Sequence, residues 1–299
     1  MKTQLAFRLS KVRKVFRHFT LDDIDLSLPR GQIMGFVGPN GAGKSTTIRI
    51  LMGLIGNDAG EVELLGRSMP RHNVWAKQRV GFVAEDMGLY RSASVDWHMS
   101  FVRSLYPSWD NSYAEELLNR FGLIREQKIK QLSHGQRVKT ALLLALARRP
   151  ELLILDEPTT GLDPLARQEV LSQLLEALQL EERAVFFSSH QTHDVEQISD
   201  LVTFIHQGRI LESEAKEPFL DRWRRLRLEF GPGVRVSLPS DSKWVSRNQR
   251  HGVLATGRFS DELLQYLSAV GASVVDVERM TLEEIFVTRV SMPGERRAA

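Results

Sequence analysis

The stretch GPNGAGKST, residues 38–46, matches the pattern G-x-x-x-x-G-K-[ST]. It follows a β-rich segment, QIMGFVG (32–38), and precedes a helix-like segment, TTIRILMGLI (46–55), which is the context that the pattern requires. Its glycines let backbone N–H groups surround phosphates, while Lys44 can neutralise the β and γ phosphates and the Ser45 hydroxyl can ligate Mg²⁺. We therefore predict a nucleotide-binding loop that consists of Gly38, Pro39, Asn40, Gly41, Ala42, Gly43, Lys44, Ser45 and Thr46.

A second acidic motif, LLILDEP (152–158), supplies carboxylates to the same kind of site. Its apolar run is typical of a buried parallel strand. Such a strand would deliver Asp156 to the Mg²⁺ side of the phosphates. Glu157 projects differently and can orient and polarise the attacking water. The alternative is a strand that simply ends in surface acids.

The stretch QLSHGQ (131–136) predicts the start of a helix. Ser133 is expected at the N-cap, with Gln136 reaching back to close a capping box. A helix start carries free N–H groups and a partial positive charge, and therefore suits an anion. The apolar run ALLLALA (141–147) within the same helix predicts burial.

The composition indicates a soluble globular protein, because 42% of the 299 residues are hydrophobic and 26% are charged. Cysteine is absent, which excludes disulfides and thiolate metal sites. We expect no signal peptide and no transmembrane segment, since no apolar run approaches the roughly 18 residues that a span needs. The net charge of +3 is too small to predict a nucleic-acid partner.

Strand-like and helix-like segments alternate along the first two thirds of the chain, which predicts an α/β fold with a mainly parallel sheet. We expect one domain at residues 1–215, a small α+β accessory domain at 216–290 and a disordered tail at 291–299. Within 253–287 the pattern reads strand, helix, strand, helix. The basic run RWRRLRL (222–228) is either a solvated face or a surface for lipid headgroups or a partner.

The order of these motifs resembles that of the ATP-binding subunits of ABC transporters. The phosphate loop is followed by LSHGQ, then by LLILDEP and by TTGLDP (159–164), and the resemblance extends from residue 5 to about 210. It implies a P-loop NTPase-type ABC ATPase domain that combines a mainly parallel core, an antiparallel β part and a helical subdomain at roughly 90–150. ATP as substrate and Mg²⁺ are the implied cofactors.

The resemblance assigns roles to four further positions. Glu157 resembles the general base, and His190, which ends AVFFSSH, resembles the switch histidine that contacts the γ-phosphate. Asp163 resembles the D-loop acid that communicates between subunits, although it can also cap the next helix. Phe16 occupies the place of the aromatic residue that stacks on adenine, with Val15 and Phe19 as alternatives.

The signature residues Ser133, His134, Gly135 and Gln136 look like contacts to the ATP held by a second subunit. His134 replaces the Gly usual in the family, either because its side chain points away or because it adds a pH-sensitive contact. Glu85 stands where the family usually has Gln. The expected metal set is therefore Ser45, Glu85 and Asp156, because a carboxylate can still ligate Mg²⁺.

These features together predict an ATP-hydrolysing motor subunit. The implied partners are a transmembrane permease and a second ATPase subunit, with a homodimer as the expected form, at the cytoplasmic side of the cell membrane. The C-terminal TLEEIFV (281–287) resembles the end of ATPase subunits of the export-type branch, and this resemblance implies export. The alternatives are a soluble ABC-type ATPase of translation or repair, a GTPase switch, which the absence of N-K-x-D disfavours, and a binding-only regulator.

Overall fold

The computed structural model describes residues 4–84, 87–179, 183–231 and 233–292. It divides into two compact units, Met1–Ser213 and Glu214–Ala299. Glu85 lies outside the described residues, as does most of the predicted tail, residues 293–299. No helix formed by the described residues is long and apolar enough to cross a membrane.

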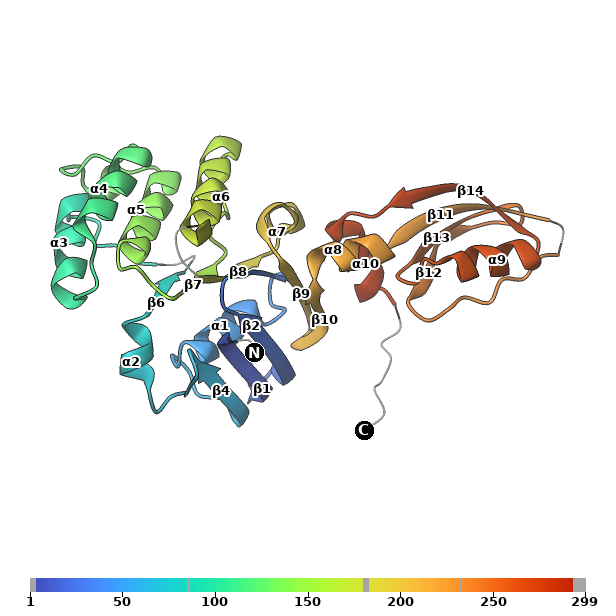
Figure 1. Cartoon of the computed structure of the whole chain (residues 1–299), viewed down its shortest axis with the longest axis horizontal. Helices are drawn as coiled ribbons and strands as arrows, with labels where there is room; N and C mark the ends of the chain where they lie inside the picture. The colour runs from blue at the N-terminus through green and yellow to red at the C-terminus, as the bar shows by residue number, and fades with distance from the viewer. Residues whose placement is uncertain (1–3, 85–86, 180–182, 232, 293–299) are drawn as a thin grey trace. The chain divides into compact units, whose positions relative to one another are not determined.

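A six-stranded sheet forms the centre of the first unit (Figure 1). The pairs β3–β8, β3–β9, β7–β8 and β6–β7 are parallel. Every residue of β3, β7 and β8 is buried, as expected for parallel strands that are covered on both faces. In sheet order the strands are β10 (Arg209–Ala215), β9 (Leu201–His206), β3 (Ile33–Val37), β8 (Ala184–Ser189), β7 (Leu152–Asp156) and β6 (Val80–Val83).

A second, antiparallel sheet joins the same hydrophobic core. Its main strands alternate between buried and exposed residues, so that one face packs inward. The rings of Phe7 and Phe186 meet edge to face at 4.9 Å and connect the two sheets. The strands in sheet order are β2 (Thr20–Pro29), β1 (Leu5–Val15), β4 (Ala59–Leu64) and β5 (Arg67–Ser68).

Helices complete the first unit, and three of them gather into one group in Figure 1. This group consists of α3 (Val95–Leu105), α4 (Asn111–Arg120) and α5 (His134–Leu146), with the short 3-10 helix η1 (Ile129–Gln131) before α5. The predicted burial of residues 141–147 is confirmed. The remaining helices are α1 (Lys44–Leu51), α2 (Asn73–Lys77), α6 (Pro164–Gln179) and α7 (Thr192–Ile198). The predicted fold class, with its parallel core, antiparallel part and helices, is confirmed.

The second unit is built on an antiparallel sheet with the order β12-β13-β11-β14. Apolar residues of β11 and α9 share a small core of their own, which includes Leu226, Leu228 and Leu263. The predicted order of strand, helix, strand, helix at 253–287 is confirmed by β13, α9, β14 and α10. The elements are α8 (Lys216–Arg222), β11 (Arg224–Phe230), β12 (Ser242–Arg247), β13 (His251–Thr256), α9 (Asp261–Ala269), β14 (Ala272–Arg279) and α10 (Leu282–Val290).

The basic run at 222–228 forms ion pairs within its own unit. It ends α8 and enters β11, where alternate residues point to opposite faces. Arg225 pairs with Glu278 of β14 and Glu284 of α10, and the Arg227 guanidinium lies 2.9 Å from Glu278. The charges are thus largely neutralised by acids of the same unit, because the antiparallel register places β14 beside β11.

Candidate active site

The phosphate loop joins the buried strand β3 to helix α1, and three of its glycines are required by its geometry. Gly41 and Gly43 have φ angles of 79° and 114°, in a region that side-chain-bearing residues rarely occupy. A Cβ at Gly38 would lie 2.4 Å from the carbonyl oxygen of Ile205. The loop therefore wraps tightly and ends at the first turn of α1, whose N–H groups suit an anion.

The side chain of Lys44 is buried in the centre of this loop. Its ammonium nitrogen lies 2.6 Å from the Gly38 carbonyl oxygen, 3.3 Å from that of Pro39 and 3.0 Å from Oε1 of Glu157. The side chains of Lys44 and Glu157 are only 5% and 6% exposed. The ammonium group thus donates to two carbonyl oxygens of the loop and forms an ion pair with the Glu157 carboxylate.

Glu157 follows the last residue of β7; its carboxylate accepts hydrogen bonds and its backbone N–H donates one. Its Oε2 atom lies 2.7 Å from Nδ1 of His190 and 2.9 Å from the hydroxyl of Thr160. Its backbone N–H lies 3.1 Å from the Ser188 hydroxyl. Its φ of 54° is left-handed, a conformation that persists at a non-glycine residue only when neighbours hold it.

The pKa of the Glu157 carboxyl is lowered from its usual value. Burial alone would raise it, but the charge of Lys44 and the hydrogen bonds from Lys44, His190 and Thr160 outweigh burial. Glu157 is therefore ionised at neutral pH. A buried carboxylate with a lowered pKa is a good ligand and orienting group, and it becomes a stronger base when its cationic partner leaves.

Asp156 is the last residue of β7, and its carboxylate is also buried. Its Oδ1 atom accepts a hydrogen bond of 2.7 Å from the Ser188 hydroxyl on the neighbouring strand β8. Ser45 is half-buried in the first turn of α1. A hydroxyl and a carboxylate are the oxygen ligands that Mg²⁺ prefers, so the donor set fits this ion.

The predicted capping box at the start of α5 is confirmed. The Ser133 hydroxyl accepts from the Gln136 N–H at 3.2 Å, and the Gln136 side chain accepts from the Ser133 N–H at 2.9 Å. Ser133 and His134 are both exposed, while Gly135 is half-buried. Nε2 of His134 lies 2.9 Å from the Thr160 carbonyl oxygen.

Asp163 precedes α6 and caps it, since its Oδ1 atom accepts from the Ala166 N–H at 2.9 Å. The capping role that we predicted for this residue is therefore confirmed. Its side chain is exposed in the loop between β7 and α6. The predicted D-loop role concerns contact with a second subunit, and it stays a prediction.

Phe16 follows β1 and is 43% exposed, so its ring is accessible from solvent. Its N–H donates to the Phe19 carbonyl, and the two ring centres lie 6.3 Å apart. Phe19 also lies against the phosphate loop, because a Cβ at Gly43 would be 3.0 Å from its ring. Phe19 is thus near the loop, and Phe16 lies beside Phe19. Val15, the third candidate for the residue beside adenine, is 50% exposed.

Seven of the predicted residues form two clusters in the described part of the chain. Lys44, Glu157 and His190 meet in the first cluster. Ser133, His134, Gly135 and Gln136 belong to the second, at the start of α5. Thr160 connects the two clusters, because its hydroxyl binds Glu157 and its carbonyl binds His134.

Sequence reasoning missed two residues of this network, Thr160 and Ser188. Ser188 lies on β8 directly beside Asp156, a pairing that depends on the strand order. Thr160 follows Glu157 by three residues, and the spacing of a tight turn was the available signal. Both supply hydroxyl donors to carboxylates that the sequence had already identified.

Comparisons with known proteins agree with this geometry. The family described as ABC transporter matches residues 21–160. The chain is 34% identical to the lantibiotic transport ATP-binding protein SrtF of Streptococcus pyogenes over 193 residues, which are 64% of this chain and 82% of that protein. It is 25% identical to the ABC transporter ATP-binding protein YtrB of Bacillus subtilis (strain 168) over 280 residues, or 93% and 94% of the two chains.

A solved structure shares the fold. It is that of cbiO1 from Clostridium perfringens, described as part of the ABC transporter complex cbiONQ. The TM-score is 0.63 at 24% identity, and the match covers 72% of this chain and 90% of that one. With its phosphate loop, its paired Lys44 and Glu157, and these relatives, the chain belongs to the ABC transporter family as an ATP-binding, ATP-hydrolysing subunit.

Proposed function

We propose that this chain binds MgATP between two subunits and uses its hydrolysis to drive a separate membrane permease. The single observation that carries the chemistry is the cluster in which the buried Lys44 and Glu157 meet the exposed His190. It places a cation that can neutralise phosphate charge beside a carboxylate that can orient the attacking water.

The first step is that the phosphates of ATP replace Glu157 as the partner of the Lys44 ammonium. The ammonium then neutralises the β and γ phosphates, and Oε1 of Glu157 is released to accept a hydrogen bond from water. The water oxygen attacks the γ phosphorus, its proton passes to Glu157, and the bond from that phosphorus to the bridging oxygen breaks, which yields ADP and phosphate. His190 donates from Nδ1 to Glu157, and we assign its Nε2 atom to the γ-phosphate, to which it donates when both ring nitrogens carry a hydrogen.

Ser45 and Asp156 are the residues that would hold Mg²⁺, which supplies charge neutralisation on the phosphate oxygens. Glu85 completes the metal set that we predicted, and it lies outside the described residues. Among the described residues, no group of three or more His, Cys, Asp or Glu could hold an ion alone.

The site is half of a composite site. The start of α5 presents an exposed Ser133 and the N–H groups of a 13-residue helix, which suit a phosphate. Its capping box uses two of the donors and fixes the geometry of the rest. We assign this start to the γ-phosphate of ATP held by a second copy of the chain, and Asp163 to contacts between the two copies.

An exposed aromatic cluster on α3 and the preceding loop supports coupling to a permease. The rings of Trp97 and Phe101 stack with an interplanar angle of 7°, and Tyr90 meets Trp97 edge to face. These three residues are 43%, 43% and 63% exposed. Aromatic residues are enriched at protein interfaces, and this cluster is the surface that we assign to the permease. Export is the direction we propose, on the TLEEIFV stretch that forms α10.

Phosphate release from MgATP, with GTP as the comparison substrate, tests the proposal. Glu157→Gln keeps the shape of the side chain but removes its basicity, so turnover should fall by at least about a hundredfold. Glu151→Gln is the matched control, because Glu151 pairs with Arg30 and Arg79 at the opposite end of β7. Equal turnover in the parent and Glu157→Gln would contradict the assignment of the base.

A further inference from the structure

The side chain of His134 makes a contact that was not among its predicted roles. It is bound to its own chain, because Nε2 lies 2.9 Å from the Thr160 carbonyl oxygen. A carbonyl oxygen can only accept, so Nε2 carries the hydrogen in this arrangement. The edge of the ring also lies against Gly161, where a Cβ would be 3.4 Å from Cδ2 and Nε2.

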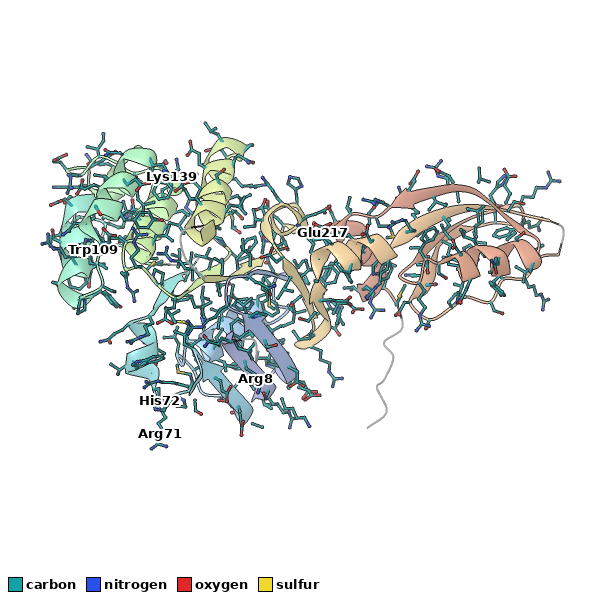
Figure 2. All side chains as sticks on the ribbon, in the orientation of Figure 1. Arg8, Arg71, His72, Trp109, Lys139 and Glu217 are labelled. Atoms are coloured by element: carbon teal, nitrogen blue, oxygen red, sulfur yellow. The ribbon has the colours of Figure 1, made fainter. Side chains whose placement is uncertain are left out.

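The neighbouring residues hold the same two segments together. A Cβ at Gly135 would lie 3.2 Å from the Cβ of Ala166, so the start of α5 packs closely on the start of α6. Further along, Lys139 of α5, labelled in Figure 2, pairs with Glu169 of α6. His134 is therefore the polar end of a continuous contact between α5 and the segment that follows β7.

The residue that His134 holds is itself bonded to the catalytic carboxylate. The Thr160 hydroxyl donates to Oε2 of Glu157 at 2.9 Å, and the Thr160 N–H lies 3.3 Å from the Glu157 carbonyl oxygen. The turn from Glu157 to Thr160 begins at a left-handed residue, so it depends on neighbours to keep its shape. His134 binds Thr160, the last residue of this turn, and Glu157 is its first residue.

We propose that His134 is a positioning residue that fixes the orientation of Glu157 through Thr160. The inference rests on the proposed role of Glu157 as base, and it gives the LSHGQ motif a second task within its own chain. Because the imidazole faces Thr160, its loss should disturb the carboxylate rather than the phosphates bound by the same helix start. The effect is then expected on kcat and not on the KM for ATP.

Three substitutions test this inference. In His134→Gln the side-chain amide nitrogen reaches about as far as Nε2 and still donates a hydrogen bond. In His134→Asn the amide is shorter, and in His134→Leu no donor is present. We expect the Leu and Asn variants to lower kcat roughly three- to tenfold, the rate equivalent of one hydrogen bond, with KM changed less than twofold. The Gln variant should recover at least half of the parental kcat.

Each other outcome overturns the inference. A parental kcat in His134→Leu would show that the contact does not position Glu157. An equal loss in the Gln and Leu variants would point to ring packing alone, and a raised KM at constant kcat would point to a direct contact with the partner's nucleotide. Absence of ATP turnover in the parent would instead reject the proposed function, so the two failures are distinguishable.

Discussion

The ion pair between Lys44 and Glu157 predicts that the nucleotide-free protein opposes its own ligand. The Lys44 ammonium already contacts two carbonyl oxygens and the Glu157 carboxylate, so a phosphate must compete with these oxygens for the same cation. Among these oxygens, only the Glu157 carboxylate carries a negative charge, so it also repels the anionic phosphates. Replacing it by an amide, in Glu157→Gln, should therefore strengthen nucleotide binding while it abolishes turnover.

The magnitude follows from the geometry. Two unit charges at 3.0 Å attract by about 5 to 6 kcal/mol at an effective dielectric constant near 20. Desolvation of a buried pair offsets most of this attraction, which leaves on the order of 1–2 kcal/mol to be broken. Removing that term should tighten binding of MgADP roughly five- to thirtyfold.

MgADP is the ligand of choice for this assay, because it is not hydrolysed and lacks the γ-phosphate that we assign to dimer formation. Isothermal titration calorimetry of the parent, Glu157→Gln and the control Glu151→Gln gives the three dissociation constants. Unchanged or weaker binding in Glu157→Gln would refute the reasoning that the ion pair competes with nucleotide.

Three further predictions concern other parts of the first unit. The pKa of Asp110 is lowered to about 2 by hydrogen bonds from Ser112, from the Tyr113 N–H that it caps, and from Arg149. In urea unfolding, Asp110→Ala should therefore cost about 1–2 kcal/mol at pH 7, and the difference should narrow as the pH falls from about 4 towards 2. Gly38→Ala should abolish nucleotide binding, because its Cβ would lie 2.4 Å from a backbone oxygen; binding within twofold of the parent would contradict this. Trp97→Ser should weaken association with the permease in a pull-down at least about tenfold with unchanged basal turnover, and equal recovery would exclude that surface.

Local chemistry accounts for what the sequence could predict. Three features are formed by residues that are close together in the sequence, so each could be recognised from a short stretch. They are the phosphate loop, the capping box at Ser133 and strand β7 with its terminal acids. The burial of residues 141–147 follows from their continuous apolar character in the same way. The order of these motifs then sufficed for the fold class.

Contacts across the sheet could not be predicted, because they depend on which strands become neighbours. Ser188 meets Asp156 only because β8 lies beside β7. Arg225 finds Glu278 only because β14 pairs with β11. The contact between His134 and Thr160 could not be predicted for the same reason, since the acceptor lies 26 residues further along the chain.

The central claim is that each chain contributes its phosphate loop to one ATP site and the start of its helix α5 to the other. Mixing two inactive variants tests this claim most directly. Lys44→Ala removes the phosphate-loop cation, and Ser133→Arg obstructs the exposed helix start that we assign to the partner's nucleotide. In a mixed dimer, the phosphate loop of the second variant faces the helix start of the first, so one site is intact. We predict that each variant alone shows little MgATP turnover and that their mixture recovers it. A mixture as inactive as its components, with dimers present, would contradict the composite site.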